Sequence, residues 1–421
     1  MKRLVEASGV SGTVVAPASK SAAQRAIVAA LLAKGESVLR HVTPCDDTLA
    51  AVGVASALGA TVETLGEECR VTSDFFAGRA GERHLSCGES GLLARMITPV
   101  AALLPGVTHV SGSGSLLTRP VEMLVRPLRQ LGVEVTTTGG CLPLVLKGAL
   151  RGGEATVDGT LGSQALTGLL MALPLAPRDS ILHVTGLKSK PYIDMTIELL
   201  QAFGAIVEHD DYRVFTVRGG QAYRPRVYDV AGDWSGASCL LVAGCIAGSV
   251  TVSHLDDHSM QADRAILEVL RRSGAGVEVW RNGHSSGVTT TRGDAARSFE
   301  FDAGECPDLF PALVALAACC KGTSRIIGAD RLIHKESNRA LVLQQEFGKL
   351  GISILVDGNV MLVTGGEIGG GELSAHDDHR IAMSLATAAL RATGTVTIDG
   401  AECVNKSYPR FWNDLERLQR G

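Results

Sequence analysis

The segment Leu58-Gly59-Ala60-Thr61-Val62 closes a helical pattern on a glycine and runs directly into a β-branched strand. Glycine suits the left-handed cap that ends a helix, because it has no Cβ to clash there. The same junction recurs four times, with spacings of 73, 72, 70 and 77 residues between the glycines. It reads LGVEV at 131–135, FGAIV at 203–207, SGAGV at 273–277 and LGISI at 350–354. So regular a period predicts a repeated structural unit.

Each period holds two helical patterns with a β-branched strand between them. We expect these strands at residues 37–42, 107–110, 180–185, 249–254, 323–327 and 395–398. A unit therefore reads strand–helix–strand–helix–strand over about seventy residues. Six units account for the chain, and the last ends in a helix at 411–420. Three units per domain is the simplest division, with a boundary near residues 224–233, where Pro225 and Gly232 interrupt the pattern.

The composition narrows the class of protein. A chain of 421 residues with 45% hydrophobic and 20% charged residues is globular and large enough for two domains. The net charge of −4 argues against a nucleic-acid-binding surface, and no apolar run approaches the ~20 residues that a membrane span needs. The ten cysteines show no metal-ligand spacing, and no signal peptide is evident. We therefore expect reduced thiols in a cytoplasmic protein.

Basic residues gather at the expected helix starts. Free backbone N–H groups and the helix dipole make a helix N-terminus attractive to anions. Lys and Arg are poor structural choices there, because they oppose the dipole. Seven of them nevertheless occupy such openings, namely Lys20, Arg25, Arg119, Lys335, Arg339, Arg380 and Lys406. Together they predict a binding site for phosphates and carboxylates.

Single residues at these junctions have simpler explanations. Hydroxyl and carboxylate side chains can cap a helix, which applies to Ser21, Ser163, Ser189, Asp308, Asp46-Asp47 and Asp256-Asp257. Lys190-Pro191 fits a turn before a helix that starts with proline, and Lys335-Glu336 fits a solvated ion pair. The prediction of an anion site therefore depends on the whole set of cations.

In the order and spacing of these residues the chain resembles the enolpyruvyl transferases, and among them those that act on shikimate 3-phosphate. The resemblance covers essentially all 421 residues. Nine short motifs carry it: Ser19-Lys20-Ser21 with Arg25, Gly88 with Gly91, Thr118-Arg119-Pro120, Ser163-Gln164, Ser189-Lys190-Pro191-Tyr192-Ile193-Asp194, Pro307-Asp308, Lys335-Glu336 with Arg339, Asp378-His379-Arg380, and Lys406. Each motif alone is weak, but nine in the right order are specific.

The resemblance implies an α/β fold of two domains, each with three βαβαββ repeats around a pseudo-threefold axis, six repeats in all. The N-terminal domain would comprise residues 19–232 and bind mainly shikimate 3-phosphate. The C-terminal domain would comprise residues 1–18 and 233–421 and bind mainly phosphoenolpyruvate. The family's active site lies in the interdomain cleft, and its domains close on substrate.

The resemblance also assigns site residues. Shikimate 3-phosphate is expected to contact Lys20, Ser21, Arg25, Ser163, Gln164, Ser189, Tyr192, Asp308 and Lys335. Phosphoenolpyruvate is expected to contact Lys20, Gly91, Arg119, Gln164, Arg339, Arg380 and Lys406. The expected catalytic residues are Asp308, Glu336, Lys20, His379 and Lys335. No cofactor, metal, nucleic acid or membrane is implied, and nothing requires more than a monomer.

The implied reaction transfers the enolpyruvyl group of phosphoenolpyruvate to the 5-hydroxyl of shikimate 3-phosphate, by addition and elimination, in the biosynthesis of chorismate and aromatic amino acids. It needs a base near the hydroxyl and an acid near the methylene carbon. We expect Asp308 on the hydroxyl side, close to Lys20 and Lys335. We expect Glu336 on the methylene side, near His379, in a pocket dry enough to keep a carboxylic acid protonated.

Five positions depart from the commonest family pattern, with Glu89, Leu92, Met96, Gly162 and Arg331 in place of Asn, Thr, Pro, Ser and Asn. Gly91 is retained, which in this family leaves room for the inhibitor glyphosate, and Leu92 beside it is expected to alter the response to that compound.

Three alternatives remain. The sister enzymes that act on UDP-N-acetylglucosamine usually have Lys-Asn at Lys20-Ser21 and a reactive Cys before an Arg-Pro pair, whereas residues 111–115 contain no Cys. A non-catalytic binding module and a pseudoenzyme are the other two, and turnover of phosphoenolpyruvate would exclude both.

Overall fold

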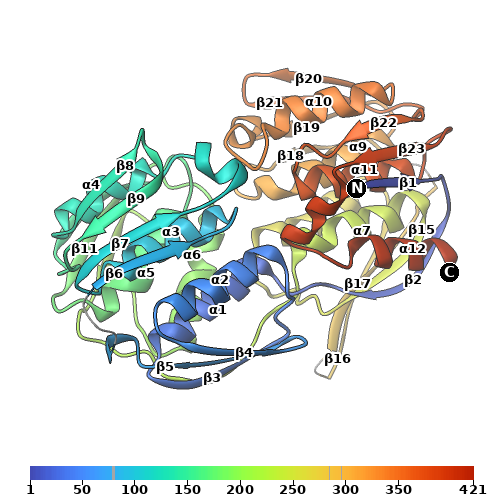
Figure 1. Ribbon diagram of the computed structural model, residues 1–421. Coiled ribbons are helices and arrows are strands. Elements are labelled where there is room, and N and C mark those ends of the chain that lie inside the picture. The colour runs from blue at the N-terminus through green and yellow to red at the C-terminus, as the bar shows by residue number, and fades with distance from the viewer. Residues whose placement is uncertain (78–80, 284, 295) are drawn as a thin grey trace. The chain divides into compact units, whose positions relative to one another are not determined.

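The computed structural model describes residues 1–77, 81–283, 285–294 and 296–421. The chain divides into two compact units, Lys20–Val230 and Met1–Ser19 with Ala231–Gly421. Figure 1 shows the elements of both units in order along the chain. We call them the 20–230 unit and the terminal unit.

The 20–230 unit contains three repeats with one sheet topology. The first consists of α1 (Lys20–Leu32), β3 (Gly35–Arg40), α2 (Asp46–Ala57), β4 (Thr61–Leu65) and β5 (Glu68–Ser73), completed by β14 (Val227–Asp229). The second consists of β6 (Gly81–Ser86), α3 (Gly91–Ala101), β7 (Gly106–Ser111), α4 (Val125–Gln130), β8 (Glu134–Thr138) and β9 (Cys141–Lys147). The third consists of β10 (Glu154–Asp158), α5 (Gln164–Ala172), β11 (Ser180–Thr185), α6 (Pro191–Ala202), β12 (Glu208–Asp210) and β13 (Val214–Val217). Their sheets are ordered β14-β3-β5-β4, β6-β7-β9-β8 and β10-β11-β13-β12.

The terminal unit repeats this order twice and then shortens it. Its first repeat consists of β2 (Val10–Val15), α7 (Trp234–Ala247), β15 (Gly248–Ser253), α8 (Ile266–Arg272), β16 (Gly276–Asn282) and β17 (Ser285–Thr291). The next consists of β18 (Glu300–Asp302), α9 (Phe310–Ala318), β19 (Thr323–Ile327), α10 (Arg339–Lys349), β20 (Ser353–Asp357) and β21 (Val360–Thr364). The last consists of β22 (Gly371–Ser374), α11 (His379–Ala389), β23 (Val396–Asp399) and α12 (Phe411–Arg420), and β1 (Lys2–Val5) pairs antiparallel with β23.

The glycine junctions confirm the repeat that the sequence predicts. Gly59, Gly132, Gly204, Gly274 and Gly351 all have φ between 85° and 99°. At the first junction Gly59 N donates to Ser56 O at 3.0 Å and Ala60 N donates to Ala55 O at 3.1 Å, which is the pattern of a left-handed helix cap. The predicted central strands correspond to β3, β7, β11, β15, β19 and β23, shifted by at most two residues.

The five-element unit read from the residues is wrong by one strand. In five repeats the second helix is followed by an antiparallel hairpin, such as β4-β5 or β20-β21. The second strand of each hairpin comes shortly before the first strand of the next repeat, so two strand patterns merge in the sequence. The observed unit is βαβαββ, as the family resemblance implies.

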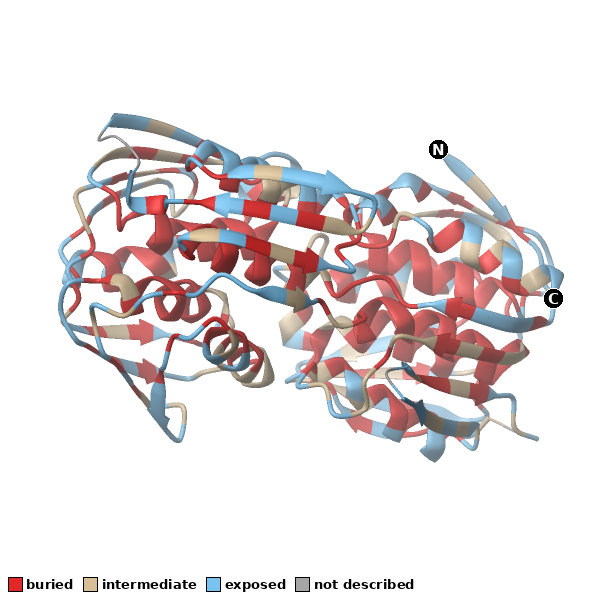
Figure 2. Cartoon of the chain, turned by 90° about the horizontal axis from the view of Figure 1, so that it is seen from below, coloured by how far each residue is buried: buried red, intermediate tan, exposed pale blue. Residues whose placement is uncertain are grey.

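The first helix of each repeat forms the core. Every residue of α3, α7, α9 and α11 is buried, whereas strands such as β11 alternate between buried and exposed residues. Figure 2 shows the central helices as continuous buried segments within each unit. A helix that is apolar on all sides belongs in a core. In α1 and α5 the residues outside the core are Lys20, Ser21 and Gln164, all at the helix start.

A buried carboxylate ties α10 to the last repeat. Both oxygens of Glu346 accept from Lys349 Nζ at 2.8 Å, one lies 2.8 Å from His376 Nε2, and the other accepts from Ser374 N at 3.0 Å. Burial disfavours the ionised form of this carboxyl, but these hydrogen bonds outweigh it and lower its pKa. Glu346 therefore stabilises the unit in its ionised form.

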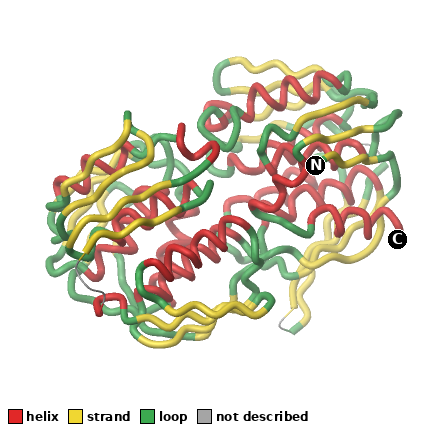
Figure 3. The backbone as a smooth tube through the Cα atoms, in the orientation of Figure 1, coloured by secondary structure: helices red, strands yellow, loops and turns green. Residues whose placement is uncertain are grey.

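The backbone trace in Figure 3 shows short helices and strands in alternation. Across the described ranges, no helix has the combination of length and apolar composition needed to cross a membrane. All ten cysteines are free and most are buried, as the sequence predicts for reduced thiols.

Candidate active site

An arginine bound to three carboxylates organises the polar centre of the terminal unit. Arg339 is the first residue of α10 and only 1% exposed. Its Nη1 donates to Asp308 Oδ1 at 2.7 Å, its Nη2 to Glu336 Oε2 at 2.8 Å, and its Nε to Asp378 Oδ2 at 2.8 Å. Burial disfavours the charged guanidinium, but the three carboxylates outweigh it and hold its pKa well above the usual value.

Asp378 connects this arginine to the start of α11. It is fully buried, caps α11 by accepting from Arg380 N at 3.0 Å, and accepts from Ser337 Oγ at 3.0 Å. The preceding residues His376 and Asp377 have φ of 50° and 53°. Residues other than glycine seldom adopt this left-handed backbone conformation, and those that do cluster at functional sites. The buried His379 Nδ1 lies 3.9 Å from Asp378 Oδ1.

Asp308 and Lys335 form the part of this network nearest to solvent. Lys335 Nζ donates to Asp308 Oδ1 at 2.9 Å, and the two side chains are 21% and 25% exposed. Burial opposes ionisation of Asp308, but Lys335, Arg339 and Arg380 outweigh it and hold the pKa of Asp308 well below its usual range. For Lys335 burial disfavours the charged ammonium group, and this is the main cause of its lowered pKa. Asp308 is therefore ionised at neutral pH.

Two further cations lie in the same unit. Arg380 is at the start of α11, whereas Lys406 is at the end of a 3-10 helix and not at the helix opening that the sequence predicts. Arg380 Nη2 is 4.0 Å from Asp233 Oδ2, and within the described residues its buried Nε and Nη1 have no hydrogen-bond partner. Burial by itself would lower the pKa of this guanidinium, but the nearby carboxylates of Asp233, Asp308 and Asp263 have the larger effect. The pKa of Arg380 is therefore raised above its usual value. Lys406 ends the 3-10 helix Ala401–Lys406, and its Nζ donates to Asp377 O at 2.7 Å.

In the 20–230 unit a chain of polar contacts holds Lys20. Its Nζ lies 3.1 Å from Asp47 Oδ2, which also accepts from Gln24 Nε2 at 3.2 Å. Gln24 Oε1 accepts from Ser90 Oγ at 2.9 Å, and Ser90 caps α3 by accepting from Leu93 N. The starts of α1, α2 and α3 are thereby linked. The N-cap of α2 is Cys45, so Asp47 holds Lys20 and is not the cap.

Arg25 is buried one turn into α1. Its Nε donates to Thr196 Oγ1 at 2.9 Å, its Nη1 to Ser21 O at 2.9 Å, and its Nη2 to Thr167 Oγ1 at 3.4 Å. Burial lowers its pKa to about 10, so it remains charged at neutral pH. Because all three acceptors are neutral, the charge of Arg25 is available to an anion.

Gly91 leaves space for two guanidinium groups. A Cβ at this position would lie 2.8 Å from Arg119 Cζ and Nη2 and 2.9 Å from Arg95 Nη1. Arg95 Nη1 donates to Gln164 Oε1 at 2.6 Å, which links the starts of α3 and α5. Arg119 follows the 3-10 helix Gly114–Thr118 and is buried, yet its Nε has no hydrogen-bond partner among the residues described.

Two of the predicted serines lie at the starts of α5 and α6. Ser163 occupies the N-cap position of α5, but its side chain makes no capping hydrogen bond. Ser189 precedes the N-cap of α6 and has φ of 59° in a buried position, and its carbonyl accepts from Tyr192 N at 3.2 Å. The Ser163 hydroxyl therefore lies at a helix start without capping it.

The departures from the family pattern have local explanations in part. Glu89 Oε2 accepts from Ser115 N at 3.4 Å and Ser115 Oγ at 3.3 Å, so the carboxylate holds the loop before Arg119. Leu92 and Met96 are buried in α3. Gly162 has φ of 136°, where a serine would be strained. Arg331 lies in the 3-10 helix Ala329–Leu332, and nothing in the structure explains its identity.

Within each unit the predicted residues assemble at the starts of the core helices or beside them. The terminal unit brings together Asp308, Lys335, Glu336, Arg339, His379 and Arg380, with Lys406 bound to the turn before α11. Sequence reasoning left out Asp378 and Asp47 as organising residues. Both lie at predicted helix starts, and Asp378 precedes the predicted Arg380 by two residues, but carboxylates at helix starts also fit ordinary caps. The contact of Asp47 with Lys20, 27 residues away, left no local signal. The substrate contacts and catalytic roles stay predictions.

Comparisons with known proteins agree on one family. The family model described as EPSP synthase (3-phosphoshikimate 1-carboxyvinyltransferase) matches residues 5–415. A 3-phosphoshikimate 1-carboxyvinyltransferase of Clostridium perfringens is 36% identical, with 99% of this chain and 98% of the relative covered. One from Methanocorpusculum labreanum is 38% identical at the same coverage. The solved EPSP synthase of Acinetobacter baumannii superimposes with a TM-score of 0.83 at 25% identity, with 99% and 98% of the two chains covered. The chain therefore belongs to the EPSP synthase family.

Proposed function

We propose that this chain transfers the enolpyruvyl group of phosphoenolpyruvate to the 5-hydroxyl of shikimate 3-phosphate, with release of phosphate and 5-enolpyruvylshikimate 3-phosphate. The family and the names of the relatives support this reaction. The product would serve chorismate and aromatic amino acid biosynthesis. We expect the chain to act as a monomer in the cytoplasm, with no nucleic-acid or membrane partner.

The proposal depends mainly on buried arginine nitrogens that have no hydrogen-bond partner among the described residues. These nitrogens are Arg119 Nε and Arg380 Nε and Nη1. Arginine stays charged in proteins, and an unsatisfied buried donor costs about 1–3 kcal/mol or more. Such nitrogens are expected where an anionic ligand completes their hydrogen bonds. Phosphoenolpyruvate brings a phosphate and a carboxylate, which pair well with arginine forks.

The proposed reaction has two steps, each with one proton taken up and one released. The 5-hydroxyl oxygen bonds to C2 of phosphoenolpyruvate, the hydroxyl proton passes to a base, and the C3 methylene receives a proton. In the second step the C2–O bond to phosphate breaks and the leaving phosphate takes the proton held by the base. The new methyl group meanwhile returns a proton to the acid residue, and the C2=C3 double bond forms again. We assign the hydroxyl side to Asp308, with Lys20 and Lys335, and the C3 side to Glu336, with His379.

The observed hydrogen bonds indicate how substrate would activate these groups. A carboxylate with a strongly lowered pKa is a poor base, and Asp308 is in this state while Lys335 and Arg339 both donate to it. A substrate carboxylate on Arg339 would compete with Asp308 and Glu336 for its guanidinium. Weaker contacts to Arg339 would raise the basicity of Asp308 and allow Glu336 to hold the proton that it donates.

The test is phosphate release by the purified chain from phosphoenolpyruvate, with and without shikimate 3-phosphate, in the presence of a chelator. Release should require both substrates and should fall by at least about 100-fold in Asp308→Asn, the loss typical of a general acid–base group. Asp256→Asn is the matched control, because it removes a carboxylate from an exposed ion pair with Arg281 in the same unit.

Other outcomes would reject the proposal in distinct ways. Release with UDP-N-acetylglucosamine in place of shikimate 3-phosphate would assign the chain to the sister reaction. Binding of both substrates without release would indicate a pseudoenzyme or binding module. An equal loss in Asp308→Asn and Asp256→Asn would remove the catalytic assignment of Asp308.

A further inference from the structure

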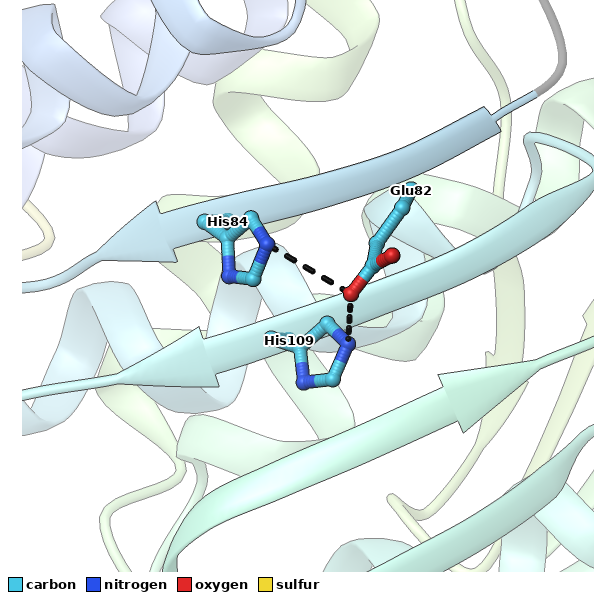
Figure 4. Close-up of side chains that lie close together, drawn as sticks. All are labelled: Glu82, His84 and His109. Carbon is cyan, nitrogen blue, oxygen red and sulfur yellow. Dashed lines mark ion pairs between the residues drawn. The ribbon is translucent and has the colours of Figure 1, made fainter.

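Two histidines and a glutamate meet on the outer face of the second sheet, apart from the helix starts described above. His84 on β6 lies directly opposite His109 on the parallel neighbour β7, and Glu82 precedes His84 by two residues on the same strand. Side chains two residues apart on a strand point to the same face. Figure 4 shows the three side chains converging over the two strands.

Their ligand atoms already face one another. Glu82 Oε1 lies 2.9 Å from His109 Nε2 and 3.5 Å from His84 Nε2, and one ligand atom from each residue lies within 4.8 Å of the others. The two imidazole rings are stacked, with centroids 4.7 Å apart and an angle of 13° between their planes. In the described part of the chain this is the one trio of His, Cys, Asp or Glu with this geometry.

We propose that Glu82, His84 and His109 bind a divalent transition-metal ion of the zinc class. Two imidazole nitrogens and one carboxylate oxygen are a ligand set that Zn²⁺ accepts, with water as the fourth ligand. In a tetrahedral site, metal–ligand distances of about 2.0–2.2 Å place the ligand atoms roughly 3.4 Å from one another. Glu82 Oε1 and His109 Nε2, now 2.9 Å apart, would therefore separate slightly to admit the ion. Glu82 and His84 are exposed and can make this movement, since their side chains are 62% and 73% exposed. Imidazole ligands select Zn²⁺, Ni²⁺ and Cu²⁺ over Mg²⁺ and Ca²⁺.

The third repeat supplies an internal comparison. There Glu154 and His183 occupy the same register positions on β10 and β11 as Glu82 and His109 on β6 and β7, and their carboxylate and Nε2 atoms are 2.8 Å apart. The residue opposite His183 is Thr156, where the second repeat has His84. The two faces thus share a Glu–His pair and differ by one potential ligand. The second histidine is what makes the metal site.

The experiment is a calorimetric titration of the full-length chain with ZnCl₂ and, separately, NiCl₂ at neutral pH, after dialysis against a chelator. One saturable equivalent is expected. Even an outer-shell partner is worth about 10- to 100-fold in metal affinity, so His84→Thr should weaken binding by at least that factor. His183→Thr, the matched control, should leave affinity unchanged, and Thr156→His should add a second equivalent.

Thermal melts of each variant without metal establish that it is folded. Zinc should raise the melting temperature of the wild-type chain and of His183→Thr, but not that of His84→Thr, because a ligand that binds only the folded state stabilises it. No saturable binding to the wild-type chain, or binding that survives His84→Thr, would overturn the proposal. His84→Thr should retain phosphate release, so failure of this site leaves the proposed function untouched.

Discussion

Replacement of Asp378 by asparagine should both destabilise the terminal unit and impair turnover. The substitution preserves shape but removes the charge that holds Arg339. Asp378 accepts two hydrogen bonds from this guanidinium, at 2.8 and 3.2 Å, and both side chains are essentially inaccessible to solvent. In Asp378→Asn an amide NH₂ group would replace one carboxylate oxygen and would face the N–H donors of Arg339, from which that oxygen now accepts hydrogen bonds.

The expected magnitude follows from the burial and from the remaining partners. Breaking a buried ion pair costs about 3–5 kcal/mol. Asp308 and Glu336 still compensate Arg339 after the substitution, so we expect the lower end, about 3 kcal/mol in the free energy of unfolding. Loss of the orientation of Arg339 should lower kcat/KM by about 10- to 100-fold, as small displacements of catalytic groups do.

The chain offers a selective probe for this measurement. Its three tryptophans, Trp234, Trp280 and Trp412, all lie in the terminal unit, so urea unfolding followed by tryptophan fluorescence reports on that unit. Asp256→Asn is the control, because an exposed ion pair contributes only about 0–1 kcal/mol. An unfolding midpoint equal to that of the wild-type chain, together with kcat/KM within two-fold, would refute the buried network as the organiser of Arg339.

Three more predictions follow from single contacts. Gly91→Ala should turn Arg119 aside and raise KM for phosphoenolpyruvate by about 10-fold, the value of one charged hydrogen bond, with little change in urea unfolding; an unchanged KM would contradict this. Asp47→Asn should release Lys20 and lower kcat/KM by about 10-fold, measured by steady-state kinetics. Circular dichroism should show that the variant keeps the normal fold. Unaltered kinetics would mean that the contact between Asp47 and Lys20 is only structural. Glu346 has a lowered pKa, so its stabilisation is present above the unfolded value of about 4.3 and lost as pH falls through the folded value. Glu346→Gln should therefore unfold at lower urea than the wild-type chain at pH 7, and the difference should shrink below about pH 4; a gap that is constant with pH would reject the assignment.

The repeat was readable from the sequence because its signals are local. A helix followed by glycine with positive φ is a short-range pattern, and all five junctions have that conformation. The hairpins were not readable, because the strands β5 and β6 of adjoining repeats have the same period and lie close in the chain. Separating them requires knowledge of which strand pairs with which, and that is decided by long-range hydrogen bonds.

The sequence by itself determined the kinds of groups at the helix starts, including Lys20, Arg339 and Arg380, and hence the expectation of an anionic ligand. Only the tertiary structure decided their partners. Asp378 and Arg339 are 39 residues apart and meet because α10 and α11 begin side by side. His84 and His109 likewise meet only through the register of β6 with β7. Charge and helix caps are local properties of a chain, whereas ion pairs and ligand clusters arise when packing brings distant segments into contact.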